Sequence, residues 1–368
     1  MADGRFRSIL IVNPFGIGDV LFATPMVRAL RLGLPESRIT FVCNARTLEL
    51  VETNRHLSGV LVFDSGEFKQ RWRTSRREAW RLLRGMWAAL HQLRCDLLID
   101  LSLEGRYSIA AMLLGIGRRV GFDVKGRGRW LTQRVALAGY EGQHVAEHYL
   151  SLLDLVGVPR DGQGLDLWLT DEDQAAARRC LVDVGVSPGE PLIALAPGGG
   201  ASWGASAINK QWLPERFVEV GRTLRRRHRV MVVGGAGEAV LCERVAAEVG
   251  GETRSLAGRT TVRQAAALLR RCQLLVCNDG GLLHVAVSQG VPTVSVFGPV
   301  DERVYGPYAP GSEGRHRAVA RDLPCHPCYR SFRMPPCPYD LACLKGFEAS
   351  VVVAAAEQLL TETVTRDQ

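Results

Sequence analysis

Short apolar runs of strand-forming residues alternate with longer segments of helical periodicity along the whole chain, and this alternation constrains the fold more than any other feature. Four runs lie in the first half and four in the second: ILIV, RITFVC, GVLVFD and DLLIDLS, then PLIALAP, RVMVVGG, QLLVCND and PTVSVFG. Strands that alternate with helices form parallel sheets with helices on both faces. Two sets of runs therefore predict an α/β protein with two domains of this kind.

The alternation breaks in the stretch GVPRDGQGLDLWLTDEDQ, where glycine, proline and charged residues replace the periodic pattern. We therefore expect a first domain over residues 1–165 and a second over 166–345. The last segment, residues 346–368, has the pattern of a helix that packs back on either domain.

The composition is that of a soluble globular protein, because 46% of the 368 residues are hydrophobic and 23% are charged. A formal net charge of +8 favours an anionic partner, such as nucleic acid, acidic lipid head groups or a phosphorylated sugar. No stretch of eighteen apolar residues and no signal-peptide pattern is present, so we expect a cytoplasmic protein without a transmembrane segment. Ten cysteines in such a protein are expected to be reduced thiols, with metal binding considered first for any close cluster.

The first strand leads into NPFGIGDVLFATP, residues 13–25. A glycine-rich turn between a strand and a helix normally binds phosphate through the amides of the helix start. Here the glycines are followed by Asp19, whose carboxylate would repel a pyrophosphate even though the helix start can stabilise it. The turn therefore indicates a role other than nucleotide binding.

The second half carries the stronger nucleotide signals. Gly198, Gly199 and Gly200 follow a strand and precede Lys210, so that backbone amides and a positive charge can approach a diphosphate. An ordinary glycine turn with a surface lysine explains this motif equally well. Glu238 follows the next glycine turn, where a carboxylate either caps the helix or accepts hydrogen bonds from a ribose hydroxyl.

The third signal is NDGGLLH, in which Asp279, Gly280 and Gly281 follow a strand and His284 lies on the next helix. This spacing places them at the carboxyl edge of a parallel sheet, where ligands bind in open α/β folds. A single helix histidine is more often structural than functional, but its spacing from the glycine turn favours a binding site.

The motifs, taken in order, resemble glycosyltransferase family 9, the ADP-heptose:lipopolysaccharide heptosyltransferase family. They are GxGD with a following proline, PGGG with KQWLPERF, GGAGE, LAGRTTVRQAAALL and NDGGLLHVAVSQGVPTVSVFGP, and they extend over nearly the whole chain. The resemblance implies a GT-B fold, in which two Rossmann-like domains face each other across a cleft. The first domain would hold mainly the acceptor and the second mainly the nucleotide-sugar donor.

The resemblance also implies roles for single residues. Asp19 is expected to be the general base, and Lys210 is expected to act on the donor in catalysis. The expected donor-binding residues are Gly198, Gly199, Gly200, Glu238, Thr260, Asp279, Gly280, Gly281 and His284. The acceptor-binding residues are expected to include Gly18 and His144, and the second basic segment described below adds Arg118, Arg119, Arg127 and Arg129. The chain departs from many relatives at Gly280, where they have a hydroxyl residue, and at Phe22, where several lipopolysaccharide enzymes have histidine.

The expected reaction is transfer of a heptose or related sugar from an ADP-activated donor to a lipopolysaccharide-core-type acceptor, with inversion at the anomeric carbon. An Asp-x-Asp metal site would be an alternative way to bind the diphosphate. The one acidic triplet, Asp171, Glu172 and Asp173, follows Thr170 at a predicted helix start, and we interpret it as a helix cap. We therefore expect metal-independent transfer with no catalytic cofactor.

Two basic segments bear on the acceptor. Residues 68–94 form a candidate amphipathic helix, either solvated with extended arginines or anion-binding, and the family's membrane-embedded phosphorylated acceptor favours binding at the cytoplasmic face of the inner membrane. The segment GRRVGFDVKGRGRWLTQR is loop-like, and its arginines suit carboxylates and phosphates. Nucleic acid is not expected to be a partner, because neither segment matches a recognition motif.

Four cysteines cluster near the C-terminus as Cys325, Cys328, Cys337 and Cys343. A C-x2-C pair with two further thiols within nineteen residues suits a structural zinc or iron ion. Free thiols and disulfides are the alternatives.

Three other functions remain open on the sequence. One is a protein heptosyltransferase of the autotransporter-modifying type, since the cysteine cluster and the altered acceptor residues allow it. A second is a sugar-nucleotide epimerase or hydrolase on the same fold, which would turn over the donor without an acceptor. A third is an inactive sugar-nucleotide-binding protein, against which the presence of Asp19 argues.

Overall fold

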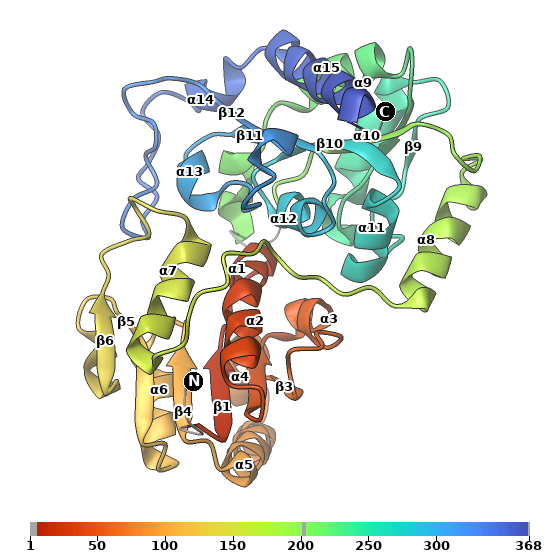
Figure 1. Cartoon of the computed structure of the whole chain (residues 1–368). Coiled ribbons are helices and arrows are strands. Elements are labelled where there is room, and N and C mark those ends of the chain that lie inside the picture. Colours follow the sequence, from red (N-terminus) through yellow and green to blue (C-terminus); the bar gives the residue numbers. More distant parts are fainter. Residues whose placement is uncertain (1–5, 201–203, 367–368) are drawn as a thin grey trace. The chain divides into compact units, whose positions relative to one another are not determined.

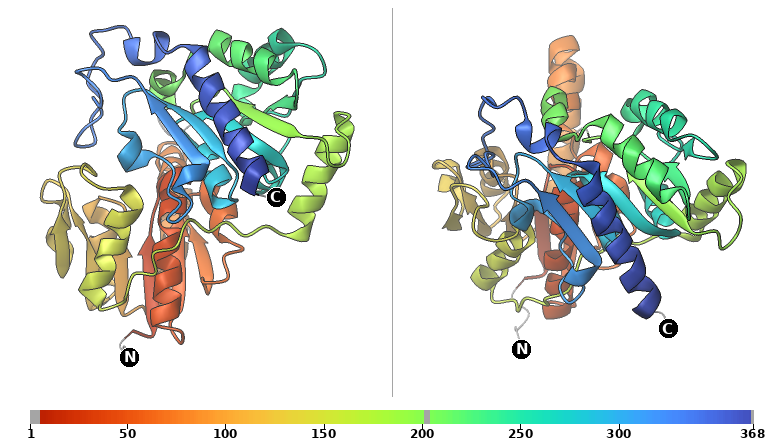
Figure 2. Two further views of the ribbon diagram at one scale, coloured as in Figure 1. Left: turned by 45° about the horizontal axis from the view of Figure 1, so that its top comes forward. Right: turned by 90° about the horizontal axis from the view of Figure 1, so that it is seen from above.

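The computed structural model describes residues 6–200 and 204–366 (Figure 1). The chain divides into two compact units: unit 1 comprises Met1–Tyr140 and Val145–Gln163, and unit 2 comprises Glu141–His144 and Gly164–Gln368. Each unit contains one parallel six-stranded sheet with helices on both of its faces (Figure 2). The predicted α/β class with two Rossmann-like domains is confirmed.

The sheet of unit 1 has the strand order β3-β2-β1-β4-β5-β6. The order changes direction between β1 and β4, and open α/β sheets bind ligands beyond the carboxyl ends of the strands at such a switch point. The strands are β1 (Ser8–Val12), β2 (Arg38–Cys43), β3 (Gly59–Val62), β4 (Leu97–Asp100), β5 (Arg118–Asp123) and β6 (Gln133–Ala136). The helices, with η for 3-10 helices, are α1 (Ile17–Phe22), α2 (Thr24–Gly33), η1 (Ala45–Thr47), α3 (Leu48–Val51), α4 (Ser65–Thr74), α5 (Arg76–Leu93), α6 (Gly105–Leu113), η2 (Arg127–Trp130), α7 (Val145–Ser151) and η3 (Leu152–Val156).

The sheet of unit 2 repeats this topology, with the order β12-β11-β10-β7-β8-β9 and a switch point between β7 and β10. Its strands are β7 (Leu192–Ala196), β8 (Arg229–Val232), β9 (Arg254–Ser255), β10 (Cys272–Asn278), β11 (Thr293–Phe297) and β12 (His316–Ala320). Its helices are α8 (Asp171–Asp183), η4 (Gly204–Lys210), α9 (Pro214–Leu224), η5 (Ala236–Glu238), α10 (Ala239–Val249), α11 (Val262–Leu269), α12 (Gly281–Ser288), α13 (Glu302–Tyr305), η6 (Glu313–Arg315), α14 (Ala342–Lys345) and α15 (Ala349–Arg366).

The central strands are buried along their whole length, as their unbroken apolar runs predict for parallel strands covered on both faces. The C-terminal helix α15 packs on α9 and on strands β10 to β12 of unit 2. The turn before it is fixed by the fully buried Trp212, whose Nε1 donates to the carbonyl of Phe347 at 2.9 Å. The last helix thus completes the core of unit 2.

The basic segment 68–94 differs from the single helix that its pattern predicts. The structure divides it into α4 and α5, and Ser75 between them is extended and accepts a hydrogen bond from the backbone N–H of Glu78. A serine three residues before a glutamate is a strong helix start signal, so the local cap outweighs the longer amphipathic pattern.

The interpretation of the acidic triplet as a cap is confirmed. Thr170 precedes α8 and forms a capping box with Asp173, whose carboxylate also pairs with Arg263 at 3.0 Å. The predicted division of the chain at residue 165 does not include one feature of the structure. Glu141–His144 belongs to unit 2, although the residues on both sides of this segment belong to unit 1.

Candidate functional site

Unit 1 places Asp19 beyond the carboxyl end of β1, at the switch point of the sheet. The connecting loop ends at Gly16, and Gly18 and the half-buried Asp19 lie in the first turn of α1. The buried Asn13 donates through Nδ2 to the backbone carbonyl of Asp19 at 2.9 Å, and the buried Asn44, which follows β2, donates to two carbonyls of the same loop. Two amide side chains from neighbouring strand ends therefore fix the position of the Asp19 backbone.

A second carboxylate, Asp100, lies at the same edge and was not predicted as a site residue. It ends β4 in register with Val12, the last residue of β1. Its carboxylate accepts hydrogen bonds from the backbone N–H and the hydroxyl of Ser102, at 2.9 and 2.5 Å. Burial raises the pKa of Asp100 to about 6. The sequence signal for this residue is an acid that ends an apolar strand run.

The predicted acceptor arginines divide into two pairs. Arg127 and Arg129 lie in η2, which follows the carboxyl end of β5, and both are exposed. Arg129 lies over the ring of Trp130 at 5.2 Å from its centroid. This pair is therefore at the same edge of the sheet as Asp19.

Arg118 and Arg119 begin β5 and lie at the amino edge of the sheet, in register with Leu97 and Leu98 at the start of β4. The guanidinium of Arg118 donates to the carbonyl of Leu155 at 3.0 Å. That of Arg119 donates to the carbonyls of Trp130 and Ile116, at 2.8 and 2.5 Å. The structure does not bring this pair together with Asp19.

His144, also predicted to bind the acceptor, belongs to the segment of unit 2 that interrupts unit 1. Its Nε2 lies 3.1 Å from the carbonyl oxygen of Gly306, and its ring centroid lies 4.8 Å from that of Tyr308. His144 is close enough to His284 to affect the pKa of that residue. The structure therefore groups it with the predicted donor residues, and its acceptor role stays a prediction.

In unit 2, the glycine loop after β7 is built around the carboxylate of Glu238. One oxygen of Glu238 accepts a hydrogen bond from the Gly200 N–H and the other from the Gly235 N–H, each at 2.9 Å. A Cβ on Gly198 would lie only 1.9 Å from Glu238 Oε1. Glu238 is thus both a helix cap and a bridge to the loop, and the Gly200 amide, expected to face a diphosphate, is engaged by this carboxylate.

A pocket of about 290 Å³, its open mouth included, lies at the switch point of unit 2. Five of the predicted donor residues line it, namely Gly198, Gly200, Glu238, Gly280 and Gly281. Thr260 lies outside it, in the turn before α11, and a hydrogen bond from Gly258 N–H to the Gly234 carbonyl connects that turn to the loop before Glu238.

Lys210 and Asp279 form an ion pair at 2.5 Å, and both side chains are nearly buried. His284 is buried in α12, and burial, followed by the charges of His144 and Lys210, holds its pKa well below its usual value. The site in unit 2 therefore has a fixed positive charge beside a neutral imidazole.

Asn278, which was not predicted as a site residue, connects these parts. The buried side chain donates to the carbonyls of Pro197 and Gly198, at 2.8 and 3.1 Å, and accepts a hydrogen bond from the backbone N–H of Trp212 at 2.9 Å. It thereby fixes both the glycine loop and the segment that follows Lys210. Its signal was its place at the end of a strand, immediately before Asp279.

The four clustered cysteines lie in one region of unit 2. The pKa values of the Cys328 and Cys343 thiols are raised, by burial first and then by the other thiols of the cluster. Within the described parts of the chain, however, no three His, Cys, Asp or Glu side chains are placed as ligands of one metal ion. The thiols are neighbours, and a structural zinc or iron ion stays a prediction.

Comparisons with known proteins agree with this arrangement. Among curated proteins, the chain is 20% identical to the lipopolysaccharide core heptosyltransferase OpsX of Haemophilus influenzae, over 79% of each chain. It is 26% identical to lipopolysaccharide heptosyltransferase 1 of Pseudomonas aeruginosa, over 88% of this chain and 86% of that protein.

Two solved structures share the fold. The glycosyl transferase family 9 protein of Veillonella parvula has a TM-score of 0.78 and 22% identity, over 97% of this chain and 98% of that one. The Escherichia coli ADP-heptose lps heptosyltransferase II has a TM-score of 0.74 and 20% identity, over 97% and 99%. A sequence model of glycosyltransferase family 9 (heptosyltransferase) matches residues 83–333, and the predicted resemblance is confirmed. Since this match spans more than half of its residues, the chain belongs to glycosyltransferase family 9.

Proposed function

We propose that the protein transfers a heptose from an ADP-activated donor to a lipopolysaccharide-core-type acceptor. The family, the curated relatives that are lipopolysaccharide heptosyltransferases, and the solved relative named for ADP-heptose support this choice. The observation that carries the proposal is the arrangement of both switch points. One presents the carboxylate of Asp19, and the other presents the glycine loops with Lys210 and Asp279.

Asp19 acts in this proposal as the general base. The acceptor hydroxyl loses its proton to the Asp19 carboxylate while its oxygen attacks the anomeric carbon of the heptose. The bond between that carbon and the diphosphate oxygen breaks, and ADP leaves with the bonding electrons. A single displacement inverts the anomeric centre without a covalent intermediate, and Asp19 then releases its proton to solvent.

The residues of unit 2 stabilise the leaving diphosphate. The Lys210 ammonium, held in place by Asp279, supplies positive charge where negative charge develops. The start of α12 at Gly281 supplies backbone amides, which favour phosphate at a helix N-terminus. The low pKa of His284 keeps its ring neutral, so it contributes hydrogen bonding rather than charge. This assignment retains the prediction of metal-independent transfer.

Glu238 is the proposed contact to the nucleoside. Each of its oxygens accepts one backbone N–H, and a carboxylate oxygen can accept a further hydrogen bond from a ribose hydroxyl. The same carboxylate would then fix the glycine loop and bind the ribose.

The proposed acceptor is an anionic glycolipid, so the enzyme would work at a membrane surface. No helix of the described chain is long and apolar enough to cross a bilayer. Surface attachment is instead supported by exposed arginines on α4 and α5, namely Arg73, Arg76, Arg77, Arg81 and Arg84, because such residues are attracted to anionic lipids.

The decisive experiment compares Asp19→Asn with Asp100→Asn, in transfer from ADP-heptose to a water-soluble, deacylated core acceptor. General-base catalysis is worth about 10²- to 10⁴-fold, so we expect Asp19→Asn to lose transfer by that factor. We expect Asp100→Asn to retain most of the activity, because its buried carboxylate is bonded to Ser102.

If Asp19→Asn transfers heptose as fast as the parent enzyme, Asp19 is not the general base. If only Asp100→Asn loses activity, Asp100 is the general base instead. If the parent enzyme consumes ADP-heptose at the same rate with and without the acceptor, the protein is an epimerase or hydrolase instead.

A further inference from the structure

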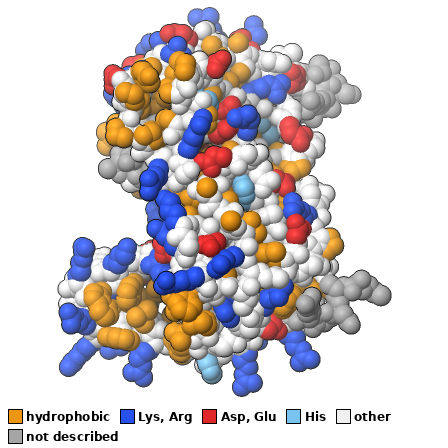
Figure 3. All heavy atoms as spheres, turned by 90° about the vertical axis from the view of Figure 1, so that its left-hand side faces the viewer, with side chains coloured by type: hydrophobic (Ala, Val, Ile, Leu, Met, Phe, Trp, Pro, Cys, Tyr) orange, Lys and Arg blue, Asp and Glu red, His pale blue; other side chains and the backbone are white. Residues whose placement is uncertain are grey.

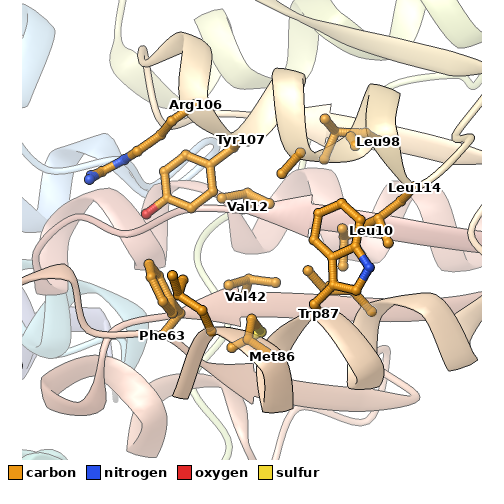
Figure 4. A pocket seen from close by; sticks show the side chains of 14 residues that line it. Leu10, Val12, Val42, Phe63, Met86, Trp87, Leu98, Arg106, Tyr107 and Leu114 are labelled. Carbon is orange, nitrogen blue, oxygen red and sulfur yellow. The ribbon is translucent and has the colours of Figure 1, made fainter. Parts of the chain in front are cut away.

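Unit 1 contains an apolar pocket that the transfer chemistry does not use. It lies between α5, α6 and one face of the sheet, and its space is about 800 Å³, the open mouth included. Trp87 and Met86 line it from α5, Tyr107 and Leu114 from the region of α6, and Val12 from the sheet floor (Figure 4). Protein interiors are close-packed, so an opening of this size points to a ligand.

The pocket exists because α5 covers the sheet incompletely. Among the eighteen residues of this helix, all of them described, Ala79 is the one buried residue. Leu90 and Leu93 near its C-terminal end pack partly against the sheet, and the preceding turns stand over the opening. On the opposite wall, Ala110 and Ala111 have side chains too small to fill the space.

The lining limits the chemistry of an occupant. Its polar side-chain groups are the guanidinium of Arg106, the hydroxyl of Tyr107 and the indole N–H of Trp87, and all other lining side chains are hydrocarbon or thioether. A peptide would bring backbone N–H and C=O groups into a pocket with few partners for them, which costs free energy. A hydrocarbon chain brings no polar group, and it suits the lining.

The surface around the pocket combines exposed tryptophans with arginines. Trp72, Trp80 and Trp87 are 39%, 55% and 41% exposed, and the rings of Trp72 and Trp80 lie 6.1 Å apart. The Arg76 guanidinium lies over Trp72, and that of Arg106 over Tyr107. Figure 3 shows hydrophobic, Lys and Arg side chains gathered on the part of unit 1 from which α4 and α5 project. Tryptophan beside arginine is typical of elements that bind the membrane interface.

We propose that this pocket takes one acyl chain of an anionic membrane phospholipid, while the arginines of α4 and α5 bind its head group and those of its neighbours. A bilayer lipid fits better than the acceptor itself, because the aromatic and basic side chains continue along both helices, and α5 alone is about 27 Å long. One acyl chain together with a basic patch gives the two attachments that stable membrane binding needs.

This inference deepens the surface binding proposed above and rests on it, but it does not depend on the transfer reaction. The main test therefore measures lipid binding without donor or acceptor, and a separate set of phosphatidylcholine vesicles that contain the acceptor glycolipid distinguishes the two kinds of lipid. The probes are vesicles of phosphatidylcholine alone or mixed with phosphatidylglycerol, with bromine atoms on the acyl chains to quench tryptophan fluorescence at short range.

Trp87 reports on the pocket through the difference between the parent protein and Trp87→Phe. We expect mixed vesicles to bind the protein and quench the Trp87 signal, and neutral vesicles to do neither. Ala110→Phe adds a ring to the pocket wall, and we expect it to remove most of the quenching and to weaken vesicle binding about tenfold. Ala247→Phe, on an exposed position of α10 in unit 2, is the matched control and should behave as the parent.

Thermal unfolding identifies variants that fail to fold, and Met86→Phe, which narrows the pocket from α5 without adding a second tryptophan, is the second filling variant. Unchanged Trp87 quenching in a folded filling variant would show that the indole inserts into the bilayer and would overturn the pocket. Binding only to vesicles that contain the acceptor glycolipid would overturn the phospholipid occupant. Failure of all vesicle binding, with transfer to the soluble acceptor intact, would remove surface attachment and leave the transferase proposal standing.

Discussion

Gly198 shows how one missing side chain shapes the donor loop. A Cβ at this position would lie 1.9 Å from Glu238 Oε1, so Gly198→Ala must displace the carboxylate that holds the Gly200 and Gly235 amides. We expect the KM for the ADP-sugar to rise about tenfold, which corresponds to roughly 1.4 kcal/mol, the scale of one hydrogen bond to a charged group.

The double variant Gly198→Ala with Glu238→Ala tests this cause. If displacement of Glu238 is the whole effect, the double variant should be no worse than Glu238→Ala alone. Gly199→Ala is the control, because its Cβ would meet the backbone carbonyl of Ala207 at 2.7 Å and removing Glu238 cannot relieve that contact. Additive losses in the first double variant would contradict the assignment.

At the scale of residues, sequence motifs predict groups such as Asp19 and Asp279, whereas residues that are defined by their partners belong to no motif. Asn278 is important because it bonds to Pro197 and Trp212, which are 81 and 66 residues away in the chain. Asp100 is unusual because burial raises its pKa. Neither property can be predicted before the strands are paired.

Strand β12 contains a buried histidine, His316, that makes the stability of the folded protein depend on pH. His316 Nδ1 lies 3.0 Å from the Thr293 hydroxyl in β11, and burial, with Arg315 and Arg317 nearby, lowers the pKa of His316 to about 4 from 6.5. The imidazole of His316 therefore binds a proton more tightly in the unfolded chain than in the folded protein. The contribution of the neutral His316 to the unfolding free energy is fully present above pH 6.5 and is lost as the pH falls to 4.

The unfolding free energy of the parent protein falls between pH 7 and pH 4, and we expect this fall to be smaller by about 3 kcal/mol in His316→Asn. The figure follows from the pKa shift at about 1.36 kcal/mol per pKa unit. Asparagine can retain a hydrogen bond to Thr293, so the variant should fold. Urea titrations of both proteins at several pH values provide the comparison. Parallel curves for the two proteins would contradict the assignment.

At the scale of elements, the apolar runs predicted the strands well, because parallel strands covered on both faces need continuous hydrocarbon side chains. The helices were harder to predict. Residues 68–94 have one amphipathic pattern, but Ser75 and Glu78 stop one helix and start another. The basic run at residues 118–129 contains a strand and a 3-10 helix, so the strand direction separates its first two arginines from the last two.

For the whole molecule, the absence of a catalytic metal from the proposed reaction is testable. We expect transfer to continue in the presence of a chelator, because Lys210 and the amides at the start of α12 carry the charge of the leaving group. Turnover with and without chelator, together with metal analysis of protein purified under reducing conditions, provides the measurement. Loss of turnover that a divalent cation restores, with no change in melting temperature, would contradict this mechanism.

The two-domain architecture was predictable because each half of the sequence contains a full set of strand runs. The interruption of unit 1 by a short segment of unit 2 was not predictable. Glu141–His144 has no sequence pattern of its own and is placed by contacts such as that between His144 and Gly306.

The interruption of unit 1 by Glu141–His144 affects how the protein folds during its synthesis. During synthesis, the first 140 residues leave the ribosome without α7 and η3, whose buried Tyr149 packs against Phe122 of β5. Unit 1 must therefore wait for residues 145–163, and by then the four residues that belong to unit 2 have already emerged. Co-translational folding cannot finish one half of this enzyme before the chain has entered the other.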